Sequence, residues 1–283
     1  MKAKWEKPYA IIIVLMFLLA LPTMVISANA HMPGARPPPP FKLEPILILD
    51  AGRKVEITID DVAEYHALRV KKEPQICLCL ACAFRATQLG ISKIWGEEIP
   101  ARDDLRIISR LPTPGSRDCF QYVTGTGPKI ETETKGEFEI VLPDGTRVTD
   151  MSNKNLKKLS KDITLDNFRF IICRKSTGEC FEVVVKEGVF PDDFFELRRK
   201  VKFGIPEKAT SEEKALFKSE WEDTRDKFLT LPDWELFENV EEPKSPVGGA
   251  IFFSILMIGL TYLLMGLSFG GKTRYTGRNW LKQ

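Results

Sequence analysis

Six cysteines and two histidines are the residues of this chain whose types and spacing could carry chemistry. Three cysteines form the run Cys77-x-Cys79-x-x-Cys82, and on a helix Cys79 and Cys82 would be i, i+3 neighbours on one face. Thiolates bind zinc and other transition metals, and His66 or Cys119 could complete a set of four ligands. One interpretation is therefore a site for zinc or another transition metal.

The same residues have a purely structural interpretation. Cysteine packs well as a small hydrophobic residue inside an apolar helix, and oxidation could instead pair these thiols as disulfides. A single histidine such as His66 is commonly a structural residue, and His31 is the only other one. A Ser-His-Asp triad would have to use His66, and no nucleophile-elbow motif accompanies it.

Cys173 and Cys180 have a different context, because they bracket a short turn between two apolar runs. Placed opposite each other on adjacent strands, their Cβ atoms would come within reach of a bond. The sequence predicts a cross-strand disulfide here, with two buried thiols as the alternative.

Two apolar segments place the chain at a membrane. Residues 247–269 carry no charge over a full bilayer span and precede a basic tail at 270–283, which predicts a transmembrane helix. Residues 1–30 combine a basic start, an apolar run and the small-x-small pattern of Ala28-Asn29-Ala30. This pattern predicts a cleaved signal peptide, or alternatively an uncleaved N-terminal anchor.

The charges flanking these segments predict the topology. The tail contains Lys272, Arg274, Arg278 and Lys282 and no acid, so the positive-inside rule places it in the cytosol. The region between the two segments is then extracytoplasmic, at the outer face of the plasma membrane. That region is mildly acidic, with 34 basic and 38 acidic side chains over residues 31–246, so nucleic acid is not expected as a partner.

The external region has three subdivisions. Residues 31–45 include four consecutive prolines and predict a polyproline II spacer, whereas residues 238–246 predict a polar juxtamembrane linker. Between them, residues 46–237 predict an α+β domain in which a mixed or antiparallel sheet of hairpins packs on a central apolar helix.

Individual elements of this domain can be assigned from pattern. A short helix is expected to begin at Asp60 or Asp61, and the apolar helix is expected from Cys77 to a glycine cap at Gly90. The remaining elements are a strand at 105–109, hairpins at 137–149 and 168–186, and a helix opening at Ser211 with Phe217, Trp221, Thr224 and Phe228 on one face.

Residues 64–125 carry further motifs, namely Ala83-Phe84-Arg85-Ala86, Pro112-Thr113-Pro114-Gly115, Asp118 and Val123-Thr124-Gly125. With FRFIICRKSTGECFEVVV and FPDDFFELRRKV further on, this stretch resembles the FmdE-like domain family of formylmethanofuran dehydrogenase over about residues 60–230. The resemblance implies the fold and metal binding. The family name does not transfer the reaction, because other components of that dehydrogenase carry its cofactors.

The chain departs from the family pattern at the implied ligands. The family's His-Gly-His element corresponds to His66-Ala67-Leu68, or to Gln75 when counted back from Cys77. Gly115 stands where the family has a cysteine, with Cys119 nearby, and a membrane segment replaces the family's zinc ribbon. Of the implied ligands only Cys77 maps cleanly, with His66 next.

Three functions follow as expectations. The first is a membrane-anchored extracytoplasmic module that binds metal or assists a membrane or envelope complex. The second is a structural or partner-binding envelope protein whose metal site has decayed. The third is a metal-dependent enzyme with His66, Cys77 and Asp118 at its site.

Overall fold

The computed structural model describes residues 32–243. Both predicted membrane segments, the basic tail and part of the predicted linker lie outside these residues. Within them, no helix is long and apolar enough to cross a bilayer. Backbone contacts divide the chain into Met1–Asn239 and Val240–Gln283, and every helix and strand below belongs to the first unit.

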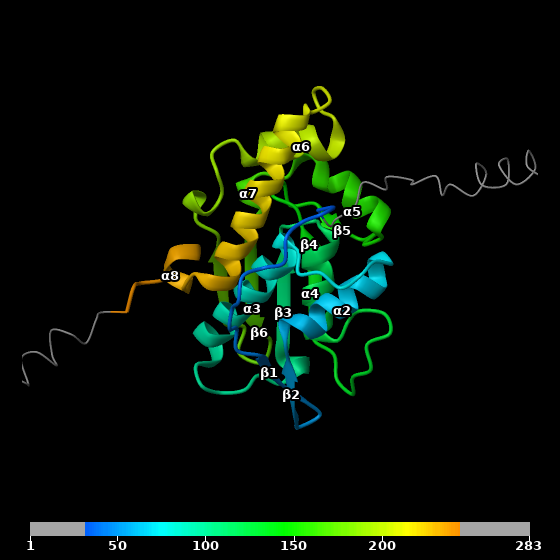
Figure 1. Ribbon diagram of the computed structural model, residues 1–283. Helices are drawn as coiled ribbons and strands as arrows, with labels where there is room; N and C mark the ends of the chain where they lie inside the picture. The colour runs from blue at the N-terminus through cyan, green and yellow to red at the C-terminus, as the bar shows by residue number, and fades with distance from the viewer. Residues whose placement is uncertain (1–31, 244–283) are drawn as a thin grey trace, which may run out of the picture. The chain divides into compact units, whose positions relative to one another are not determined.

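A five-stranded mixed sheet forms one side of the domain (Figure 1). Its order is β5-β4-β3-β6-β7, with β3 and β4 parallel and the other neighbours antiparallel. The strands are β3 (Leu105–Ser109), β4 (Glu137–Val141), β5 (Arg147–Val148), β6 (Arg169–Arg174) and β7 (Cys180–Val184). A separate antiparallel hairpin pairs β1 (Ile46–Asp50) with β2 (Arg53–Ile57).

Seven α-helices occur among the described residues. They are α2 (Ile59–Val70), α3 (Leu78–Trp95), α4 (Pro114–Thr124), α5 (Asn153–Leu159), α6 (Phe194–Phe203), α7 (Ser211–Thr230) and α8 (Asp233–Leu236). Short 3-10 turns lie at Arg102–Asp104, Ser160–Asp162, Leu165–Asn167 and Glu187–Val189.

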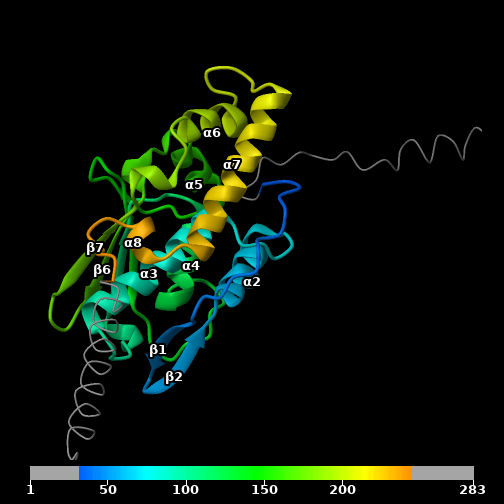
Figure 2. The ribbon, with the colours of Figure 1, turned by 60° about the vertical axis from the view of Figure 1, so that its left-hand side comes forward.

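The elements form three layers (Figure 2). Helices α3 and α4 pack against each other and against the sheet, and α2 and α7 cover their other side. Most of α3 is buried, which fits its apolar sequence from Leu78 onward. The α+β class, the mixed sheet and the central apolar helix predicted from the sequence are therefore confirmed.

The predicted disulfide is also present. Cys173 on β6 lies opposite Cys180 on β7, and the two sulfurs are bonded. The hairpin at 137–149 and the buried face of α7 likewise follow the prediction, with Phe217, Trp221 and Phe228 all buried.

Two helix boundaries differ from the prediction. Helix α2 is capped by Thr58, whose side chain accepts from the Asp61 backbone N–H in a capping box, rather than by an aspartate. Helix α3 does not end at Gly90 but continues to Trp95, with Gly96 as its cap. Gly90 serves close packing instead, because a Cβ there would lie 2.5 Å from Ile172 Cγ1 on β6.

The Gly90→Ala variant should destabilise the domain by about 2 kcal/mol, because the new methyl group overlaps a stiff β-branched side chain. Thermal unfolding of the full chain in detergent measures this change. Combining Gly90→Ala with Ile172→Ala should cost less than the sum of the two single changes, since each relieves the other's misfit. Additive losses would show that helix and strand do not approach each other closely at this point.

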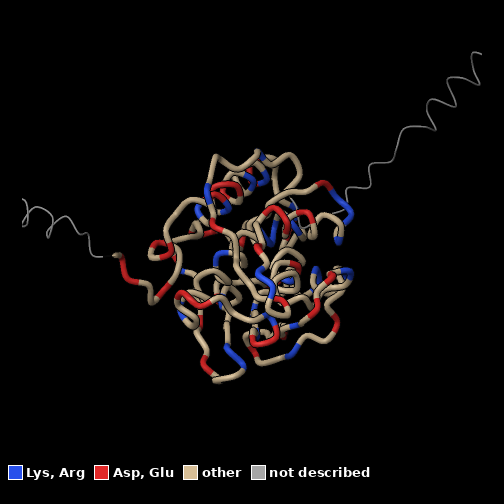
Figure 3. The backbone as a smooth tube through the Cα atoms, turned by 90° about the horizontal axis from the view of Figure 1, so that it is seen from below, with Lys and Arg blue, Asp and Glu red and all other residues tan. Residues whose placement is uncertain are grey.

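The segment predicted as a spacer is attached to the domain. Arg36 forms ion pairs with Glu222, Asp223 and Asp226 of α7, and its carbonyl accepts from Arg225 Nη1 at 2.9 Å. The proline run therefore begins at a fixed point on α7. Elsewhere acidic and basic residues are interspersed along the backbone (Figure 3).

Candidate functional site

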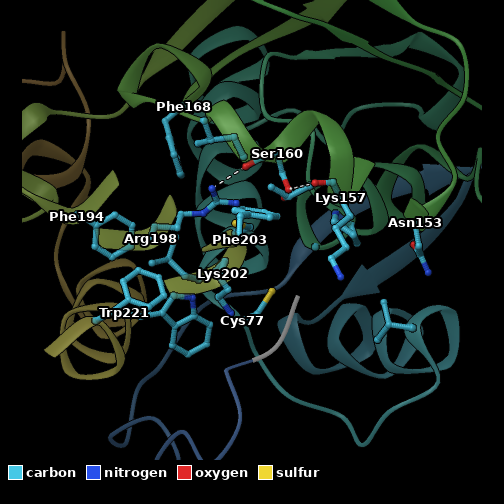
Figure 4. Close-up of a pocket in the computed structure, with 18 of the residues that line it drawn as sticks. Cys77, Asn153, Lys157, Ser160, Phe168, Phe194, Arg198, Lys202, Phe203 and Trp221 are labelled. Atoms are coloured by element: carbon cyan, nitrogen blue, oxygen red, sulfur yellow. Dashed lines mark hydrogen bonds between the residues drawn. The ribbon is translucent and has the colours of Figure 1, made fainter. Parts of the chain in front are cut away.

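A pocket of about 170 Å³ opens where α3 and α4 begin (Figure 4). Its floor includes the first residues of both helices, and its walls come from α5, α6 and α7. The side chains used below are Cys77 and Cys79 from α3, Arg198 and Lys202 from α6, and aromatic residues from α6, α7 and the turn before β6.

The two helix starts lie close together because of a glycine. A Cβ at Gly115, in the first turn of α4, would stand 2.6 Å from Cys77 Sγ at the N-cap of α3. Thr113 caps α4 by accepting from the Ser116 N–H, and Pro114 fills its first position. The positive ends of two helix dipoles therefore meet at the pocket.

Two basic side chains of α6 line the pocket one helical turn apart. Arg198 donates from Nη1 to the Ser160 carbonyl at 2.7 Å, and its guanidinium faces the pocket (Figure 4). The Lys202 Nζ lies 5.9 Å from the centroid of the Phe217 ring. Burial and the positive charge of Arg198 lower the pKa of Lys202 to about 8.

The walls are aromatic. Phe194 and Phe217 have ring centroids 5.4 Å apart, and Phe168, Phe203 and Trp221 complete this surface. Such walls contribute apolar area for a ligand while the few polar groups fix its orientation.

The predicted ligands Cys77, Cys79, Cys82 and Cys119 all carry free thiols close to α3 and α4. Cys77 and Cys79 line the pocket, whereas Cys82 and Cys119 are fully buried behind it. Burial raises the pKa of all four thiols, that of Cys77 to about 12. These thiols are therefore protonated at neutral pH.

His66 lies away from the pocket, on α2. Its Nδ1 is 2.7 Å from Asp118 Oδ2, and both side chains are fully buried. The other oxygen of Asp118 accepts a hydrogen bond from Arg117 Nε at 2.8 Å and forms an ion pair with Arg117 Nη2 at 2.6 Å. His66 and Asp118 thus belong to a buried ionic network that joins α2 to α4.

In the described part of the chain the predicted metal ligands are not grouped as a metal site. Over residues 32–243, no group of three or more His, Cys, Asp or Glu side chains has an arrangement that could hold a metal ion. Zinc binding by Cys77, Cys79, Cys82, His66 and Cys119 stays a prediction, which elemental analysis of the full chain can check.

Sequence reasoning missed the basic pair of the pocket. Arg198 and Lys202 stand about 120 positions after Cys77, so no local pattern connects them with the cysteine run. The available signal was the i, i+4 spacing of two basic residues in a helix with several phenylalanines. In the sequence, the aromatic residues of the pocket wall cannot be distinguished from aromatic residues that fill the hydrophobic core.

Comparisons with protein-family models, with curated proteins and with solved structures found no match for this chain. The resemblance to the FmdE-like domain family therefore depends only on the residues quoted above. The site has to be interpreted from its own geometry.

Proposed function

We propose that this chain is a membrane-anchored extracytoplasmic module that binds a small organic molecule in the pocket between α3, α4, α6 and α7. The observation that carries the proposal is the pocket itself, which is lined by aromatic side chains and by several polar groups. In this proposal the module retains an FmdE-like fold and is an accessory to a membrane or envelope complex.

Ligand binding has more support than metal binding. Among residues 32–243 no group of three or more His, Cys, Asp or Glu side chains is arranged to hold a metal ion, whereas the pocket is formed by residues of that same region. An enzyme using His66, Cys77 and Asp118 has less support as well. The side chains of His66 and Asp118 are buried in contact with each other, and neither lines the pocket.

The extracytoplasmic location is supported by two independent features. The Cys173–Cys180 disulfide is typical of an oxidising compartment. The basic tail after residue 269, outside the described residues, favours a cytosolic C-terminus.

Protease added to intact cells should remove the domain and spare an epitope tag placed after Gln283. The reason is that a bilayer protects a cytosolic tail, while residues 31–246 are exposed outside. Immunoblotting for the tag gives the result. Loss of the tag in intact cells, with a cytosolic marker still protected, would reverse the topology.

Ligand binding can be measured through Trp221, which lines the pocket. Titration of small organic molecules into the full chain in a neutral detergent should change its tryptophan fluorescence. The change should disappear in Trp221→Phe and persist in Trp234→Phe, whose side chain does not line the pocket. A response that survives in Trp221→Phe, or none from any compound, would contradict binding at this pocket.

A further inference from the structure

We infer that the ligand of this pocket is an organic anion with one small apolar body, held by its anionic group against Arg198 and Lys202. The inference rests on the proposed function and names the chemical class that the pocket accepts. Carboxylates and phosphate esters share the required chemistry, and the experiment below separates them.

The charge of the pocket is one-sided. Four basic residues line it, namely Lys72, Lys157, Arg198 and Lys202, and no aspartate or glutamate is among the lining residues of the described chain. Such a concentration of positive charge within low-dielectric walls attracts anions.

The placement of Arg198 and Lys202 strengthens this inference. They are i, i+4 neighbours on α6, so two like charges share one helix face at the edge of an apolar cavity. Burial disfavours the charged forms of both side chains, and the positive charge of Arg198 further disfavours that of Lys202. An anion bound between the two groups would relieve both effects.

The N-terminal ends of two helices also favour an anion in the pocket. Helices α3 and α4 direct their N-terminal ends to the pocket, where their dipoles contribute further positive potential. The guanidinium of Arg198 uses Nη1 on the Ser160 carbonyl, which fixes the orientation of its planar group. A guanidinium held in this way is suited to bind a carboxylate or a phosphate oxygen.

The volume limits the size of the apolar body. A cavity of about 150 Å³ accommodates benzene, and this pocket has about 170 Å³. One aromatic ring or a short acyl chain therefore fits against the wall formed by Phe194, Phe217 and Trp221. Benzoate has the required combination of a ring and a single anionic group.

The experiment titrates four compounds into the full chain in neutral detergent, monitored by Trp221 fluorescence. Benzoate and phenyl phosphate test the anionic group, benzamide removes the charge, and acetate removes the ring. We expect the better of the two aromatic anions to bind roughly tenfold or more tightly than benzamide and than acetate. The ratio of benzoate to phenyl phosphate affinity identifies the anionic group.

Variants locate the contact. Arg198→Met and Lys202→Met should each weaken binding of the aromatic anion roughly tenfold or more and leave benzamide binding unchanged. Arg199→Met is the matched control, since it removes the same charge from α6 at an exposed position outside the pocket. If the Arg198→Met variant unfolds because it loses the hydrogen bond to the Ser160 carbonyl, the anion affinity of Lys202→Met compared with that of Arg199→Met decides whether the basic pair binds the anion.

The outcomes separate the two proposals. Equal affinity for benzoate, phenyl phosphate and benzamide would overturn the anion inference while leaving a small-molecule pocket in place. An equal loss in Arg199→Met would overturn it too, because a contact with Arg198 and Lys202 could not then be distinguished from the general charge of α6. If none of the four compounds changes the Trp221 fluorescence, the anion inference is overturned. The proposed function fails only if no other small organic molecule changes this fluorescence either.

Discussion

Replacing Lys202 by methionine should make the ligand-free domain more stable at neutral pH while weakening its binding of an aromatic anion roughly tenfold or more. Methionine keeps the length of the side chain and removes a charge that burial and Arg198 disfavour. A pKa lowered from 10.5 to about 8 corresponds to about 3 kcal/mol, and because the Lys202 side chain keeps some contact with solvent we expect a gain on the order of 2 kcal/mol. For a domain of this size the melting temperature should rise by about 5 °C.

The pH dependence of this gain follows from the direction of the shift. Below pH 8 the lysine is protonated in both the folded and unfolded states, and its full penalty applies. As pH rises from about 8 to 10.5, the folded state loses the proton first, so the penalty shrinks and finally vanishes. The stability difference between variant and wild type should therefore be largest below pH 8 and close to zero above pH 10.5.

The groups around Lys202 are the same in both proteins. Among the described residues they include Arg198 on α6, Cys77 and Cys79 at the start of α3, Lys72 after α2, and Lys157 on α5. The raised thiol pKa values lower the stability of both proteins above about pH 9, and this effect cancels in the difference. A difference that is constant from pH 7 to 10.5 would show that Lys202 is not desolvated.

The second large effect should come from Asp118. Asp118→Ala should destabilise the domain by about 3–5 kcal/mol, because it leaves the buried guanidinium of Arg117 without its carboxylate partner. Thermal unfolding of the full chain measures this loss. Asp166→Ala is the matched control. The Asp166 carboxylate is mostly exposed, and its ion pair with Arg169 is long, at 4.0 Å, so that its loss should have little effect on stability.

A double variant separates an unpaired charge from lost packing. Asp118→Leu combined with Arg117→Met removes both charges and should recover much of the stability lost in Asp118→Ala. If the double variant is less stable than Asp118→Ala, the network contributes more than charge compensation. If Asp118→Ala and Asp166→Ala are equally stable, the buried network does not hold α2 against α4.

Much of the fold could be predicted because its signals are local. The strand at 105–109, both hairpins of the sheet and the disulfide follow from alternation and turn residues within about 20 positions. Gly90 shows the limit of such reasoning. A glycine near the end of an apolar run resembles a helix cap, and only the approach of Ile172 reveals its role.

The site was harder to predict because its parts are distant in sequence. Cys77 stands out in the sequence, yet the chemistry of its surroundings comes from Arg198 and Lys202 on α6. His66 and Asp118 also stand out individually, but their mutual contact across 52 positions gives both a structural role that spacing could not indicate. The surroundings of Cys77 and the roles of His66 and Asp118 are therefore set by tertiary packing, which local sequence patterns do not reveal.

The most direct test of the central proposal is a crystal structure of the chain with 4-bromobenzoate, in which bromine is located by its anomalous scattering. We expect bromine against the wall formed by Phe194, Phe217 and Trp221, with the carboxylate within hydrogen-bonding distance of Arg198 and Lys202. An empty pocket at saturating ligand, or a carboxylate directed away from these two side chains, would contradict the proposal.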